Sequence, residues 1–284
     1  VIGAMTQREI TRKADLLDLG GRLTSPGWAR DLVLRYDRRA IRASPFRIKE
    51  WDYYCMLTDE FGAAFTIADN SYMGMVSASI LDFTQPWEIT TSVITPFPMG
   101  KFHMPPSSAE GDVHFHNNRV NMAFALDRRR RRISVDFASF TGGKSLSGEI
   151  SMVMPEPLDT MVIATPFAQD PLAFYYNQKI NCMPAGGRLR LGQDEFVFEE
   201  GKAWAVLDWG RGVWTRTNTW YWGSASGAVD GVPFGFNIGY GFGDTSAASE
   251  NMAFYANKCH KLDQVAFNIP ADSFTKPWTF GSND

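Results

Sequence analysis

Apolar and polar residues alternate at every second position over many short stretches of this chain, and turn residues separate these stretches. Side chains of a β-strand point alternately to its two faces, so a period of two predicts strands with one buried face. The period of 3.6 that favours helices is nearly absent, and only residues 6–19 show it weakly. The pattern therefore predicts an all-β protein.

The predicted strands fall into two sets on either side of a proline-rich segment. The first set reads as an antiparallel meander over residues 31–36, 51–58, 62–68, 73–82, 112–117, 119–127 and 132–139. The second set covers residues 188–191, 195–199, 203–207, 220–225, 232–241, 251–255 and 259–268. Prolines between Met154 and Pro171 favour a domain junction there. We expect two β domains, residues 1–160 and 161–284.

Composition excludes several classes of partner and site. A net charge of −3 gives no electrostatic reason to expect binding to nucleic acid or to an anionic membrane surface. The three cysteines are far apart and odd in number, which argues against a disulfide framework and favours a reducing compartment. No run of about 18 apolar residues and no secretory signal is found, so we expect a cytoplasmic protein with no membrane-spanning segment.

Residues 204–244 are the most informative part of the chain because five of its nine tryptophans lie there. A tryptophan usually fills a pocket and needs an acceptor for its indole N–H, so this density predicts a binding site. Trp209 stands directly beside Asp208 and close to Arg211. On a strand, Asp208 and Gly210 share one face, and Trp209 points to the other.

Asp208 is the predicted proton donor, with Arg211 as its electrostatic partner. A carboxyl group at an apolar cavity could protonate an alkene or shuttle an enol proton. The alternative is structural, because an Asp208–Arg211 pair or a bond from Asp208 to the backbone would only fix the glycine-rich turn.

Aromatic residues predict the walls of the cavity. Trp220 and Trp222 alternate with Tyr221, so both indoles share a face that could stack a conjugated or polycyclic ligand, unless they fill a packed barrel core. Trp51 and Tyr53 likewise share a face, and Asp52 on the other face is either a second acid or a hydrogen-bonding residue at a domain interface. Further predicted ligand-binding residues are Trp209, Trp214, Tyr240, Asp244 and Glu250.

The histidines raise a metal hypothesis that the sequence leaves open. His114 and His116 would lie on one face of a strand, with His103 nearby, and this spacing is frequent among zinc or iron ligands. The alternative is a solvated hairpin end, because Asn117 and Asn118 follow directly and no fourth ligand is identifiable. We therefore predict neither a metal nor a cofactor. Without a Gly-x-Ser-x-Gly motif, a serine hydrolase is not favoured either.

Five blocks of sequence carry a resemblance to a known family. Residues 49–54, 67–69 with Tyr72, 206–212, 219–226 and 239–251, in this order, resemble the DUF2804 family of uncharacterised proteins. More remotely, Asp208-Trp209-Gly210 followed by Trp220-x-Trp222 is similar to a motif of carotenoid 1,2-hydratase-like proteins. That resemblance implies two lipocalin-like (calycin) β-barrels. The present chain departs from the hydratase motif in having Arg211-Gly212 and in lacking a histidine beside Asp208.

Together these observations predict two lipocalin-like antiparallel β-barrels packed side by side. The sequence stops directly after an aromatic alternation, so we expect the second barrel either to have closing strands beyond Asp284 or to have its open edge covered by another element. The expected function is binding of a hydrophobic small molecule, such as an isoprenoid, a polyketide or a lipid, with or without cofactor-free hydration, isomerisation or cyclisation. The alternatives are a non-catalytic carrier of such ligands and a structural or interaction protein with a filled core.

Overall fold

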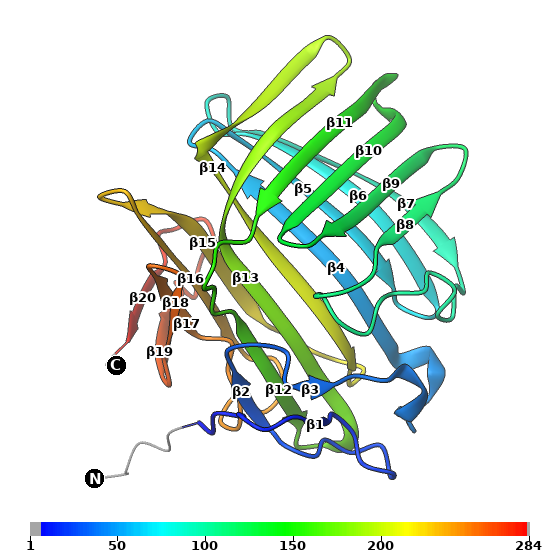
Figure 1. Ribbon diagram of the computed structural model, residues 1–284, viewed down its shortest axis with the longest axis vertical. Coiled ribbons are helices and arrows are strands. Elements are labelled where there is room, and N and C mark those ends of the chain that lie inside the picture. The colour runs from blue at the N-terminus through cyan, green and yellow to red at the C-terminus, as the bar shows by residue number, and fades with distance from the viewer. Residues whose placement is uncertain (1–6, 283–284) are drawn as a thin grey trace.

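The computed structural model describes residues 7–282, which are almost entirely antiparallel β structure (Figure 1). The strands of the main sheet are β2 (Gly27–Ala29), β4 (Ile48–Leu57), β5 (Phe61–Asp69), β6 (Met73–Asp82), β7 (Trp87–Pro96), β8 (Val113–His116), β9 (Val120–Asp127), β10 (Arg130–Thr141), β11 (Lys144–Val153), β12 (Met161–Phe167), β13 (Asp170–Leu191) and β14 (Asp194–Val213). A second sheet contains β15 (Tyr221–Val229), β16 (Val232–Tyr240), β17 (Met252–Tyr255) and β18 (Lys258–Lys261). The remaining elements are β1 (Ala14–Asp15) paired with β3 (Leu34–Arg35), β19 (Val265–Asn268) paired with β20 (Thr279–Ser282), and the 3₁₀ turns η1 (Arg38–Ala40) and η2 (Pro45–Arg47). The all-β prediction is confirmed.

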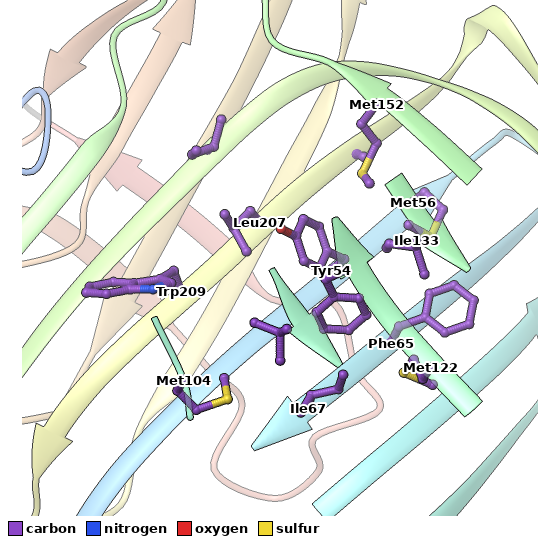
Figure 2. Close-up of a cluster of buried hydrophobic side chains, with 14 of the residues drawn as sticks. Tyr54, Met56, Phe65, Ile67, Met104, Met122, Ile133, Met152, Leu207 and Trp209 are labelled. Carbon is purple, nitrogen blue, oxygen red and sulfur yellow. The ribbon is translucent and has the colours of Figure 1, made fainter. Parts of the chain in front are cut away.

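The main sheet curls so that its early and late strands face each other. Its order is β7-β6-β5-β4-β14-β13-β11-β10-β9-β8, with β12 on the first half of β13 and β2 on β12. In Figure 1, β4 to β7 and β8 to β11 form opposite walls. Thr91 Oγ1 on β7 donates a hydrogen bond to the carbonyl oxygen of Phe140 on β10 at 2.6 Å, which joins the two walls. The enclosed space holds the larger hydrophobic core, part of which Figure 2 shows.

A second, smaller core lies between the main sheet and the β15–β18 sheet. It contains Met161 and Tyr175 from β12 and β13, and Met252 and Phe254 from β17. The two faces of β13 line different cores, since Tyr176 belongs to the larger core and its neighbour Tyr175 to the smaller one. The chain therefore builds two β layers around two cores that share β13, as the two-barrel prediction requires.

The sequence pattern missed several strands for an identifiable reason. β12 and the first half of β13 are buried on both faces, so they show no alternation, and the proline-rich segment was read as a junction. Among the described strands, β7 pairs with β6 alone, and it is largely exposed, which also weakens its pattern. The predicted break between residues 191 and 195 is confirmed, because β13 ends at Leu191 and β14 begins at Asp194. The predicted break at residues 200–202 is wrong, because β14 continues through it as one strand of 20 residues, and β13 already begins at Asp170.

The weak helix predicted at residues 6–19 is wrong over its described part, residues 7–19. This segment is extended because its backbone bonds to neighbouring chain: Ile10 N donates to the oxygen of Trp28 at 2.6 Å and Leu16 N to that of Arg35 at 3.0 Å. Burial of Ile10 and Leu16 in the larger core fixes it there. No helix within residues 7–282 has the length and apolar character needed to cross a membrane.

Candidate functional site

A cavity of about 360 Å³ opens between the main sheet and the β15–β16 hairpin. Its walls are mainly aromatic: Trp51, Tyr53, Tyr72, Tyr175, Trp214, Trp220, Trp222 and Phe242. Its polar lining residues are Lys49, Thr66, Asn70, Lys179, Asp208 and Glu250. Tyr72 and Trp220 are 46% and 48% exposed, so they lie at the mouth, while Tyr175 and Lys179 are buried at the floor. Such a cavity suits a small molecule with a large apolar surface and few polar groups.

Strand alternation on β4 and β14 places the side chains of one wall. Lys49, Trp51 and Tyr53 occupy alternate positions of β4 and all face the cavity. Trp51 lies opposite Gly210 in the β4–β14 register. A Cβ atom at Gly210 would lie 1.9 Å from Trp51 Cζ2, so only glycine lets the indole lie flat against β14.

The floor of the cavity holds a buried lysine between two carboxylates. Lys179 on β13 is 1% exposed, and its Nζ lies 2.6 Å from Asp208 Oδ2 and 3.4 Å from Glu250 Oε2. The same Nζ lies 4.8 Å from the centre of the Trp222 ring. We call Lys179, Asp208 and Glu250 the Lys–Asp–Glu cluster. One cation between two carboxylates leaves a formal charge of −1 in a space of low dielectric, which strengthens each interaction.

Neighbouring side chains hold both carboxylates in place. Asp208 Oδ1 accepts hydrogen bonds from Asn177 Nδ2 at 2.6 Å and from Trp51 Nε1 at 3.3 Å. Glu250 Oε2 accepts one from Asn237 Nδ2 at 3.1 Å, and Asn237 Oδ1 in turn accepts one from Trp222 Nε1 at 2.8 Å. Two indoles of the aromatic wall are thus tied, directly or through Asn237, to the charged cluster.

Tyr175 adds a neutral hydroxyl group to the cavity floor. Burial raises the pKa of Tyr175 well above its usual value, and the charges of Glu250 and Asp208 raise it further. The hydroxyl group therefore stays protonated and can donate a hydrogen bond to a ligand. Its ring stacks on Trp51 with centroids 5.9 Å apart, which fixes its orientation.

Lys49 is the second cation of the cavity and lies near its mouth. It is 9% exposed; its Nζ donates to the backbone oxygen of Asn70 at 3.4 Å and lies 4.0 Å from the centre of the Tyr72 ring. Burial lowers the pKa of Lys49 to about 8. Its ammonium is thus far less compensated than that of Lys179.

Seven of the predicted site residues line this one cavity: Trp51, Tyr53, Asp208, Trp214, Trp220, Trp222 and Glu250. They come from β4, from β14, from β15, from the segment between β14 and β15, and from the segment before β17. The predicted shared faces of Trp51 with Tyr53 and of Trp220 with Trp222 are confirmed, since all four face the same space. Their functional roles stay predictions.

Arg211 and Trp209 lie elsewhere, and the predicted pairing of Arg211 with Asp208 is wrong. Both residues point from β14 to the face opposite Asp208, into the larger core, where Figure 2 shows Trp209 beside Leu207. Arg211 is fully buried and forms an ion pair with Asp52, with Nη1 and Nη2 each 3.1 Å from Oδ1. Asp52 therefore has a structural partner and is not a second acid of the cavity.

Two further predicted ligand-binding residues do not line the cavity. Tyr240 is 57% exposed and stacks on Tyr221 at the outside of the hairpin. Asp244 closes a turn, where its Oδ1 accepts hydrogen bonds from the backbone N and the Oγ of Ser246. Tyr240 is separated from the cavity because it alternates with the inward-facing Gly239 on β16.

The histidine pair lies on an exposed strand, β8. The rings of His114 and His116 stack with centroids 6.5 Å apart, and His114 Nε2 lies 2.7 Å from Asn121 Oδ1. Within residues 7–282 no group of three or more histidine, cysteine, aspartate or glutamate side chains is arranged to hold a metal ion.

The sequence reasoning missed nine lining residues: Lys49, Thr66, Ala68, Asn70, Tyr72, Met75, Tyr175, Lys179 and Phe242. Lys49 could have been found, because it shares the alternating face of Trp51 and Tyr53. No local signal could have shown Tyr175 and Lys179, since their part of β13 is buried on both faces and was not predicted as a strand.

Comparisons with known proteins agree with the fold. Residues 7–284 match the family described as DUF2804, a domain of unknown function. No curated protein matches the chain. Kievitone hydratase from Nectria haematococca is similar in structure, with a TM-score of 0.54 and 9% sequence identity over 95% of this chain and 83% of that one. An AttH-like protein from Nitrosomonas europaea is similar with a TM-score of 0.49 and 12% identity, over 83% of this chain and 75% of that one. The lipocalin-like fold prediction is confirmed.

Proposed function

The chain belongs to the DUF2804 family, a domain of unknown function, and from the geometry of its cavity we propose that the protein binds a hydrophobic small molecule and carries out acid–base chemistry on it. One observation carries the proposal: eight aromatic side chains surround the buried Lys–Asp–Glu cluster in a single cavity. Its volume of about 360 Å³ is at the lower end for ligand sites, which favours a compact, ring-containing isoprenoid or polyketide over a long-chain lipid.

The aromatic walls would hold the ligand, and the floor would meet its reactive part. The neutral hydroxyl group of Tyr175 can donate a hydrogen bond to a ligand oxygen, and the Lys179–Asp208 pair can give or take a proton beside it. Hydration, isomerisation and cyclisation each need such a transfer to an alkene or from an enol. Kievitone hydratase, which shares the fold, is by name a hydratase, and hydration at this site is part of our proposal.

A carrier without catalysis is the second candidate, and one observation favours it. Both oxygens of Asp208 already have partners, namely Lys179 on Oδ2, and Asn177 and Trp51 on Oδ1. A carboxylate held this way could serve only to fix the cavity wall.

Binding is tested with 2-naphthamide, a neutral planar probe, by titration calorimetry. We expect one site per chain, and at least about tenfold weaker binding in Trp222→Ala because the variant loses a stacking wall. The matched control is Trp87→Ala, on edge strand β7 and 41% exposed, which should bind like the wild type. Equal affinity in Trp222→Ala and the wild type, or no binding at all, contradicts the proposed site.

Catalysis is tested with the small molecules that co-purify with the protein from its own host. They are extracted and then incubated with the purified protein, and their conversion is measured. Asp208→Asn should still bind 2-naphthamide but convert the co-purified compound at least about 100-fold more slowly, as expected on loss of a general acid or base. Asp194→Asn on the exposed β13–β14 hairpin is the control. Unchanged conversion by Asp208→Asn rules out a role of Asp208 in proton transfer. If the wild type does not convert the compound, the non-catalytic carrier is the function that remains.

A further inference from the structure

The two lysines of the cavity differ in how their charges are compensated. Lys179 lies between two carboxylates, whereas the Lys49 ammonium forms no ion pair within residues 7–282. Its contacts are one long hydrogen bond to the Asn70 carbonyl oxygen and the face of Tyr72. Burying a cation without a nearby anion costs free energy, so a negatively charged group bound at this end of the cavity would be stabilised.

The acids nearest to Lys49 in the sheet are turned away from it. Glu50 lies on the other face of β4, where Tyr36 donates to Oε1 at 2.8 Å and Arg38 pairs with Oε2. Asp69, opposite Glu50 on β5, accepts hydrogen bonds from the backbone N of Ser71 at 2.9 Å and of Gly100 at 2.8 Å. Neither carboxylate is available to Lys49.

Across β14, the residues facing Lys49 contribute a donor and no acid. Gly212 is its register partner, and a Cβ atom there would lie 3.2 Å from Trp214 Nε1, so the indole N–H lies over this glycine. Trp214 Nε1 is buried and has no hydrogen-bond partner within residues 7–282. Lys49 and an unpaired indole N–H thus lie at the same level of the β4–β14 register, with the indole over Gly212 and the ammonium by Asn70 and Tyr72.

The Lys–Asp–Glu cluster is at the opposite end. Asp208 faces Tyr53 in the register, four residues from Lys49 along β4, which corresponds to roughly 13 Å at about 3.3 Å per residue. Trp51 lies between the two positions. At the floor of the cavity, the charge of Lys179 is thus balanced by nearby carboxylates. Trp51 lies in the middle, and the Lys49 ammonium at the mouth has no carboxylate partner within residues 7–282.

We infer that the ligand carries an acidic group, a carboxylate or a phenolate, which binds to the Lys49 ammonium and the Trp214 indole N–H while its ring system lies against Trp51. This inference rests on the proposed function and adds the class and orientation of the ligand. The ligand's other end then reaches the Lys–Asp–Glu cluster.

Two probes of the same shape and different charge test the inference: 2-naphthoate and the neutral 2-naphthamide. At pH 7 we expect the wild type to bind 2-naphthoate at least about tenfold more tightly than 2-naphthamide. Lys49→Met should abolish this preference while it keeps 2-naphthamide binding, which also shows that the cavity is intact. Lys202→Met removes an exposed lysine of β14 that pairs with Glu199 and should behave like the wild type.

The pH dependence gives an independent readout. Lys49 loses its proton as the pH rises through its pKa of about 8, so the affinity for 2-naphthoate should fall between pH 7 and 9.5, by about sevenfold for a tenfold charge preference and by about thirtyfold at most, and that for 2-naphthamide should not change. Lys49→Arg, which stays charged, should remove this fall. If 2-naphthamide binds and 2-naphthoate is not preferred, the inference is wrong but the proposed function stands; if neither probe binds, both are overturned.

Discussion

At the scale of single residues, neighbours on one strand serve different purposes because their side chains alternate. Asp208 points into the cavity, whereas Trp209 and Arg211 point into the larger core. Arg211 donates to Asp52 and also, at 2.8 Å each, to the backbone oxygens of Trp51, Gly210 and Pro105. Its guanidinium thus fixes the backbone behind the cavity wall without reaching the ligand space.

Replacing this arginine should affect stability more than binding. Arg211→Met leaves the Asp52 carboxylate buried without its partner, and we expect the free energy of unfolding to fall by about 3–5 kcal/mol. Urea denaturation measures this change. Adding Asp52→Asn to the variant should restore part of the loss, because the uncompensated charge disappears. The affinity of the folded variant for 2-naphthamide should change less than about threefold, within roughly 0.7 kcal/mol; a loss as large as that in Trp222→Ala would instead place Arg211 in the binding site.

At the scale of elements, β13 decides most of the architecture. Along its 22 residues it pairs with β12, β11 and β14, and it carries Tyr175 and Lys179 to the cavity floor. β13 pairs first with β12 and then with β11, and soon after this change the backbones of β13 and β11 approach each other closely. At Gly187, with φ +145°, a Cβ atom would lie 2.3 Å from the carbonyl oxygen of Glu149 on β11. The strand can follow this path only with glycine at that position.

Gly187→Ala should therefore destabilise the protein by about 2–3 kcal/mol, because the added methyl group meets a backbone carbonyl that no rotamer change can move. Thermal and urea unfolding measure the effect. Gly227→Ala on β15 is the matched control: no heavy atom lies within 4 Å of the added Cβ, and the free energy of unfolding should stay within about 0.5 kcal/mol of the wild-type value. Equal stability of the two variants would contradict the role of the close approach.

At the scale of the whole molecule, the two cores are coupled through the strand that they share. Phe174 and Tyr176 belong to the larger core, and Ala173 and Tyr175, which alternate with them on β13, to the smaller one. In addition, β4 from the first half of the chain pairs with β14 from the second along ten residues. Unfolding of either core removes one support of the other.

We therefore expect a single cooperative unfolding transition in urea. Tryptophan fluorescence, which reports on Trp209 in the larger core and Trp28 in the smaller one, and far-UV circular dichroism should give the same midpoint. Two separate transitions would show that the cores unfold independently and would favour division at residue 160, which stays a prediction.

Local patterns in the amino-acid sequence predict where strands run and to which face their side chains point. Alternation identified exposed-face strands such as β4, β9 and β16, and it correctly placed Trp51 with Tyr53 on one face of β4, because side-chain direction on a strand depends only on the backbone. Trp220, directly before β15, lines the same cavity as Trp222 on that strand. The concentration of tryptophans also led to the correct region for the cavity.

Which strand faces meet depends on how segments far apart in the sequence pair and pack. Lys179 joins Asp208 because β13 pairs with β14, and Glu250 joins them because the second sheet packs on the first, contacts between residues up to 71 positions apart. Arg211 forms its ion pair with Asp52 and not with Asp208, because β4 pairs with β14 and places Asp52 on the same side of the sheet as Arg211. Pairing of distant strands depends on the packing of the whole chain, and no local pattern records it.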